Sequence, residues 1–172
     1  MSSFLTLPFL CFSMSRPYLI SILLTALVIP IGGASVEHLI YAAPWSALLF
    51  SKWFIFSAGG LRLLIAGIKQ VMDPAFTAQR IFHIQGTESL PVVRELGFAN
   101  CCMGSLGVLS LVAPQWRMAA AFTSGLYFTF AALGHIKKKP VGPNERLALW
   151  SDVLIAAGLV ASLVAQFQDG TG

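Results

Sequence analysis

The chain has 172 residues, of which 56% are hydrophobic and only 10% are charged, and its mean hydropathy is +0.77. Soluble domains carry about 25% charged residues, and a soluble fold of this length could not bury so much apolar surface. The net charge of +4 comes from basic residues near the ends of apolar segments, which fits membrane topology better than nucleic-acid binding. The composition therefore predicts a single membrane domain over residues 1–172.

Several apolar stretches reach the length of about 20 residues that a helix needs to cross a bilayer. Residues 4–14 are apolar but too few for this role. The sequence predicts an all-α, polytopic transmembrane helical bundle with spanning helices at residues 18–40, 46–71, 90–113, 117–136 and 145–166. Pro30 and Gly32-Gly33 predict a bend in the first of these helices.

The first apolar segment has a second interpretation. Arg16, the apolar run and the small residues Gly33-Ala34-Ser35 also fit a signal peptide that is cleaved near Ser35. The long uncharged stretch before Arg16 and the late position of Pro30 favour a retained span. Both interpretations stay open at this point.

A short amphipathic segment separates the second and third spans. Asp73-Pro74 is a typical helix start, with the aspartate as cap and the proline in the first turn. On a helical wheel an apolar arc faces a polar one: Ala78, Ile81, Phe82 and Ile84 against Gln79, Arg80 and His83. The pattern predicts one interfacial helix over residues 74–85.

Basic residues are concentrated at one membrane face. With five spans, that face carries eight of the 11 lysines and arginines, the other carries Lys52 and Arg117, and Arg62 is intramembrane. Under the positive-inside rule the basic face is cytoplasmic. The N-terminus is therefore expected in the cytoplasm and the C-terminus outside.

Polar residues inside the predicted spans gather in the cytoplasmic half. A rise of about 1.5 Å per residue places Arg62, Glu95, Asn100, His135 and Asp152 there, on four helices. Ionisable groups in a bilayer rarely face lipid, so we expect these side chains to turn inward and pair. Glu95 is the expected partner of Arg62, and Asp152 is the rival partner.

Three interpretations of this polar centre remain. It could be an ion-pair network that fixes helix register, or a site in which the same five residues bind a polar headgroup or a quinone-like ring. A third interpretation is a catalytic or metal site of Glu95, His135 and Asp152. These three lie on separate helices without motif spacing, so no metal or cofactor is predicted.

The polar positions also fall in longer motifs. These motifs are Leu61–Gly67, Gln70, Asp73–Ala78, Ile81-Phe82, Arg94–Asn100, Gly134-His135, Asn144-Glu145 and Ser151-Asp152. Over roughly residues 50–160 the chain resembles an uncharacterised bacterial integral-membrane family, catalogued as a domain of unknown function. More distantly it is similar to four-helix DoxX-like membrane proteins, from which the extra first helix departs. The resemblance implies that the polar positions matter, and it implies a bacterial inner membrane.

We therefore expect a non-enzymatic membrane protein, a binding or accessory subunit for a lipid-like or quinone-like molecule in the inner leaflet. The alternative is a membrane enzyme that uses Glu95 and His135 as acid and base, together with Asp152. The expected partners are the bilayer, such a ligand, and a second copy or another membrane subunit, with no nucleic acid.

Reporter fusions test the expected topology. A reporter after Gly172 should be active outside the cytoplasm, and one at Pro140 should be active inside, because the basic face lies between the fourth and fifth spans. Cytoplasmic activity at both positions would contradict the fifth span. A mature N-terminus near Ser35 would establish the signal-peptide interpretation.

Overall fold

The computed structural model describes residues 16–139 and 142–170, and within these ranges all regular structure is helical. Within the described residues five helices are long and apolar enough to cross a membrane, which confirms the predicted all-α class and number of spans. The predicted apolar segment at residues 4–14 lies outside the described residues.

The spanning helices comprise ten elements. They are α1 (Arg16–Leu23), η1 (Leu24–Val28) and α2 (Ile29–Tyr41); α3 (Ala47–Phe54), η2 (Ile55–Leu61) and α4 (Arg62–Met72); α5 (Leu90–Leu109); η4 (Pro114–Trp116) and α6 (Arg117–Lys138); and α7 (Pro143–Gly170). An eleventh element, η3 (Phe76–Ile81), lies between α4 and α5. α5 ends at Leu109 and not at the predicted residue 113. Ser110, which follows its last residue, donates from Oγ to Gly107 O at 2.7 Å.

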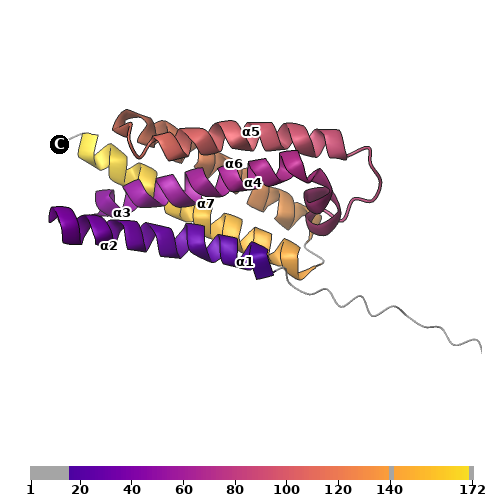
Figure 1. Ribbon diagram of the computed structural model, residues 1–172, viewed down its shortest axis with the longest axis horizontal. Coiled ribbons are helices and arrows are strands. Elements are labelled where there is room, and N and C mark those ends of the chain that lie inside the picture. The colour runs from indigo at the N-terminus through magenta and orange to yellow at the C-terminus, as the bar shows by residue number, and fades with distance from the viewer. Residues whose placement is uncertain (1–15, 140–141, 171–172) are drawn as a thin grey trace, which may run out of the picture.

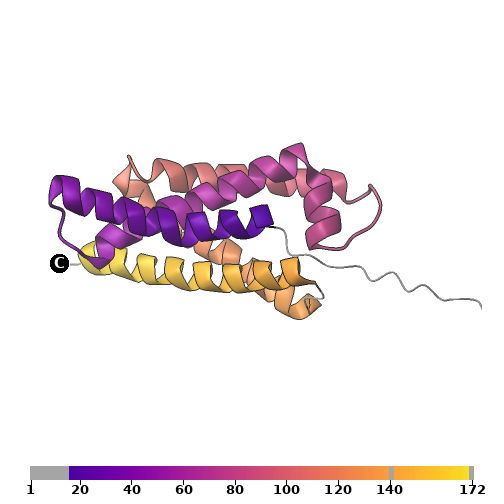
Figure 2. The same ribbon diagram turned by 60° about the horizontal axis from the view of Figure 1, so that its bottom comes forward.

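The helices run side by side along the long axis of the molecule (Figure 1). One end holds the start of α1, the segment between α4 and α5, the end of α6 and the start of α7; Figure 2 shows the same grouping from another side. We call this the basic end, because these elements carry there Arg16, Arg80, Arg94, Lys137–Lys139 and Arg146. The α2–α3 connection and the α5–α6 turn form the opposite end.

The first two spanning helices each contain a wider π turn, η1 and η2. The turn η1 ends just before Pro30, whose missing N–H cannot support a regular helix turn, so the distortion precedes the predicted bend. The two wide turns are joined directly, since Ser57 Oγ donates to Thr25 O at 2.6 Å. This hydrogen bond ties the first helix to the second within the bundle.

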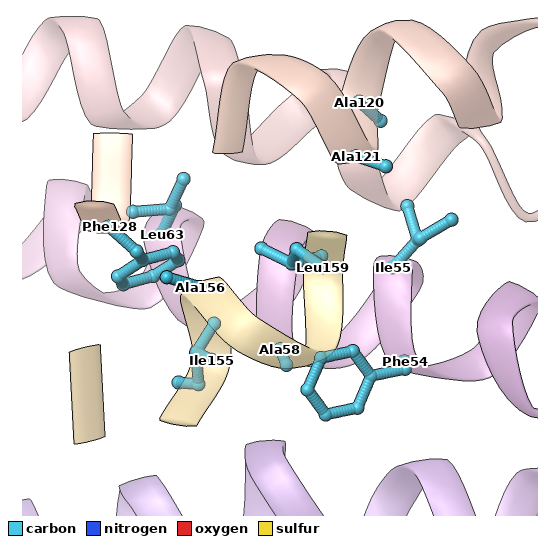
Figure 3. Close-up of a cluster of buried hydrophobic side chains, with 10 residues drawn as sticks. All are labelled: Phe54, Ile55, Ala58, Leu63, Ala120, Ala121, Phe128, Ile155, Ala156 and Leu159. Carbon is cyan, nitrogen blue, oxygen red and sulfur yellow. The ribbon is translucent and has the colours of Figure 1, made fainter. Parts of the chain in front are cut away.

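The helix α3–η2–α4 is the centre of the bundle. In its most apolar stretch 56% of the residues are buried, compared with at most 39% in the other spanning helices. Its side chains form the apolar core with α6 and α7, shown in Figure 3: Phe54, Ile55, Ala58, Leu63, Ala120, Ala121, Phe128, Ile155, Ala156 and Leu159. Any polar group on this helix must therefore find its partners inside the protein.

Glycines let α5 approach the central helix closely. A Cβ added at Gly104 would lie 2.4 Å from Leu64 N, and one at Gly107 would lie 2.4 Å from Gly60 Cα. Backbones that touch in this way leave no room for any side chain. We call this contact of Gly104 and Gly107 with the central helix the glycine seam. It fixes the rotation of α5 and hence which of its residues face the interior.

The short segment after α4 agrees with the prediction only in part. Asp73 caps it, accepting from Phe76 N at 3.3 Å, and the hydrogen bond from Lys69 lowers the pKa of Asp73. The helix covers residues 74–81 and not 74–85, because the backbone turns left-handed at His83 (φ 56°). Ile84, predicted on the apolar arc of this helix, therefore lies beyond the helix end and is exposed.

Substitution of Gly104 tests the seam. Gly104→Ala should lower the free energy of unfolding by about 1–3 kcal/mol, because the new methyl group meets backbone atoms of α4. The loss should appear as a lower Tm. Gly134→Ala on α6 is the matched control, since nothing lies within 4 Å of its added Cβ. Equal Tm for both variants in detergent would contradict the close approach.

Candidate functional site

A cavity of about 480 Å³ lies in the basic-end half of the bundle. All five spanning helices and the η3 segment contribute to its wall. The polar lining residues are Tyr18, Ser21, Arg62, Lys69, Gln70, Thr77, Tyr127, His135 and Asp152. The remaining wall is apolar, with Phe76, Phe82 and Phe128 as its aromatic members. Its volume falls in the range of small-molecule sites, about 300–1,000 Å³.

Arg62 and Asp152 form a buried ion pair on this wall. Arg62 Nη2 lies 3.2 Å from Asp152 Oδ1 and donates to Ser151 Oγ at 2.8 Å. The side chains are only 9% and 10% exposed. The guanidinium also lies over the Phe128 ring, 5.5 Å from its centroid. A charge on the central helix is thus neutralised by α7.

His135 stands between two carboxylates of α7. Its Nε2 is 3.9 Å from Asp152 Oδ2, and its Nδ1 is 3.9 Å from Glu145 Oε1. Glu145 is fully buried and lies 3.4 Å from Lys138 Nζ, which reaches the surface at the basic end. Lys138 also donates to Phe82 O, so it joins the α6 terminus to the segment that closes the cavity.

A second polar group surrounds Asn100. Its Nδ2 donates to Gln70 Oε1 at 2.8 Å and to Tyr127 Oη at 3.1 Å, and the residue is 1% exposed. Gln70 and Tyr127 line the cavity. The predicted inward position of Asn100 therefore corresponds to a hydrogen-bonded group beside the ion pair.

Glu95 does not join these residues, which corrects the expected Arg62–Glu95 pair. It is exposed on α5, and so are Ala99 and Cys102, which share its face. The glycine seam is the cause, because it turns Gly97 and Asn100 inward. A residue two positions from Gly97 is rotated about 200° away from it. Glu95 therefore points out of the bundle near the basic end, next to Arg94.

Sequence reasoning missed several of the site residues. Glu145 lies at a helix start where a solvated carboxylate is usual, and Gln70 and Tyr127 are not ionised at neutral pH. Gln70, Glu145 and Ser151 did belong to the motifs on which the family resemblance rested. At the opposite end Glu37 was also missed; it binds Lys52 Nζ at 2.7 Å and Trp53 Nε1 at 2.8 Å.

In the described ranges, no group of three His, Cys, Asp or Glu side chains is arranged to hold a metal ion. The site that these ranges do contain is an ion pair, a histidine between carboxylates and an amide group around one cavity. Its possible chemistry is hydrogen bonding, charge pairing and proton transfer.

Fold and site together define a small multi-pass membrane protein, a five-helix bundle with a polar cavity near one end. The chain belongs to a family of unknown function, DUF6790, which matches residues 18–171. The predicted membership of an uncharacterised family is thus confirmed, whereas the bacterial origin and the DoxX-like resemblance stay predictions. No curated protein and no solved structure matches the chain.

A double-mutant cycle tests the ion pair. Arg62→Leu and Asp152→Leu should each lower the free energy of unfolding, by about 3–5 kcal/mol, because each strands a buried charge. The double variant should recover most of the loss. Thermal unfolding in detergent provides the measurement.

Glu95→Leu is the control for this cycle, because Glu95 is an exposed carboxylate on a neighbouring helix. Its effect on Tm should be small and should add to that of Arg62→Leu. Strong coupling between Arg62 and Glu95, or additive losses for Arg62 and Asp152, would contradict the observed pairing.

Proposed function

We propose that the protein binds a lipid-soluble molecule with a polar head or ring, lipid-like or quinone-like, in the cavity beside Arg62. The observation that carries the proposal is the composition of the cavity wall. The wall combines polar groups, among them a charged pair, two phenols and an amide, with apolar and aromatic side chains. Such a mixture suits a ligand that has one polar and one apolar part.

The position of the cavity supports the same function. It lies towards the basic end, and the η3 segment forms part of its wall with Phe76, Thr77, Ile81 and Phe82. The exposed face of this segment is polar, with Gln79 and Arg80. A molecule at the membrane surface could thus place its head among the polar groups and its tail among the apolar ones.

The positive-inside rule assigns the basic end to the cytoplasm. The protein is then a multi-pass protein of an inner membrane, with its N-terminus in the cytoplasm and its C-terminus outside. The cavity lies in the inner leaflet, where a membrane-dissolved ligand or a partner subunit would meet it.

A second candidate function is acid–base catalysis in the same cavity. The arrangement that favours it is His135 between Asp152 and Glu145. Glu95 has no part in this version, because it is exposed on α5. A product that disappears in His135→Gln, from protein that still folds and still retains its ligand, would favour catalysis over binding.

Filling the cavity tests the binding function. Native mass spectrometry of detergent-purified protein should detect a retained small molecule of one mass class. Ala131→Phe should abolish the retained mass, because Ala131 lines the cavity. Ala66→Leu should reduce it by the same mechanism from α4.

Ala119→Phe is the matched control, since Ala119 is exposed on the same helix as Ala131. It should leave both the retained mass and Tm unchanged. A ligand that survives in both cavity variants, while each keeps its Tm, would contradict binding at this site.

A further inference from the structure

The two oxygens of Asp152 are divided between two basic groups. Oδ1 faces Arg62 Nη2 at 3.2 Å, and Oδ2 faces His135 Nε2 at 3.9 Å. Among the described residues Asp152 is the only carboxylate paired with Arg62. As long as Asp152 is ionised, the guanidinium is neutralised by the protein itself.

A ligand that brings a negative charge would upset this balance. It would add a second anion beside Arg62 in the interior of the bundle, where an uncompensated charge is costly. Transfer of one proton to Asp152 removes the excess. Arg62 then exchanges the Asp152 carboxylate for the ligand anion, and the net charge of the cavity stays the same.

A row of ionisable side chains leads from the basic end to Asp152. Glu145 Oε1 lies 3.4 Å from Lys138 Nζ, a side chain that is 43% exposed at the basic end, and 3.9 Å from His135 Nδ1. The other ring nitrogen faces Asp152. Both separations from the ring are longer than a hydrogen bond, so a small movement of the ring is needed to form each one.

The groups around His135 come from several parts of the chain. Lys138 belongs to α6, Glu145 and Asp152 to α7, and the Phe82 ring next to η3 stacks on the imidazole with centroids 6.1 Å apart. Arg62 of α4 pairs with Asp152, which in turn faces the ring. The ring is therefore held at the junction between the cavity and the basic end.

We propose that the cavity takes an acidic amphiphile, an alkyl chain with a singly charged anionic head, together with one proton that His135 delivers to Asp152. The step rests on the proposed binding function. The proton enters from water at the basic end through Glu145 to Nδ1, while Nε2 releases its proton to Asp152 Oδ2. Asp152 becomes a neutral carboxylic acid, and Arg62 binds the anionic head.

The test uses purified protein in nanodiscs of zwitterionic phosphatidylcholine. The probe is 1-decanesulfonate, which stays ionised at all working pH values, so any proton taken up must bind to the protein. Calorimetry in buffers of different ionisation enthalpy counts the protons. We expect about one proton per bound probe, and a Kd that rises about tenfold per pH unit where Asp152 is ionised in the free protein.

Asp152→Asn mimics the protonated carboxyl. It should bind decanesulfonate with no proton uptake and no pH dependence, whereas Arg62→Gln should not bind it. His135→Gln should keep the equilibrium proton count but take up the proton more slowly in stopped-flow measurements with a pH dye. Glu37→Gln at the opposite end is the matched control and should behave like the unchanged protein. If Asp152→Asn fails to fold, the proton count of the unchanged protein decides.

Three further probes separate the alternatives. Methanesulfonate should bind at least tenfold more weakly, and equal binding would overturn the amphiphile. Decanesulfonate binding without proton uptake would overturn the proton-linked step. Binding of decylubiquinone or 1-decanol alone would overturn this inference and leave the proposed function intact. Binding of none of these probes, with no mass retained in native spectrometry, would overturn both.

Discussion

A guanidinium in the interior of an apolar bundle needs a counter-charge at a fixed place, and in this protein Asp152 supplies it. Arg62 lies on the central helix, so removal from water leaves it few alternatives to pairing with another helix. The pair fixes α7 against α4, and Ser151 adds a second bond from the same turn. His135, Glu145 and Lys138 then extend the polar contacts to the surface. Burial of one charge thus explains why the polar groups gather at one end.

The glycine seam between α5 and the central helix α3–η2–α4 complements this constraint. Gly60, Gly104 and Gly107 bring the two backbones into contact, while Asn100 on the same face of α5 bonds Gln70 and Tyr127. The apolar core includes Phe54, Ile55 and Ala58 of the central helix, which Figure 3 shows together with side chains of α6 and α7. The cavity occurs where the core gives way to the polar end. Its wall consequently carries both kinds of surface, which is the basis of the proposed ligand.

The sequence was sufficient for the helices and for most of the polar centre. Hydropathy defines the spans because a bilayer demands about 20 apolar residues, and depth counting placed Arg62, Asn100, His135 and Asp152 at one level. Depth carries no information on helix rotation, so Glu95 was assigned to the interior. The buried stripe Val93, Gly97, Asn100, Gly104 and Gly107 contains that information, since glycines at this spacing mark the contact face. The burial of Glu145 depends on the α6–α7 packing, which no local pattern predicts.

Solid-state NMR in lipid bilayers tests the central claim most directly. With ¹⁵N in the arginine guanidinium groups and ¹³C in the aspartate carboxyl groups, the 3.2 Å contact of Arg62 with Asp152 predicts a dipolar coupling between the two labels. Asp152→Asn, which carries no label, should abolish this coupling, and Glu95→Gln should leave it unchanged. A coupling that survives Asp152→Asn, or its absence from the unchanged protein, would contradict the buried pair on which the account rests.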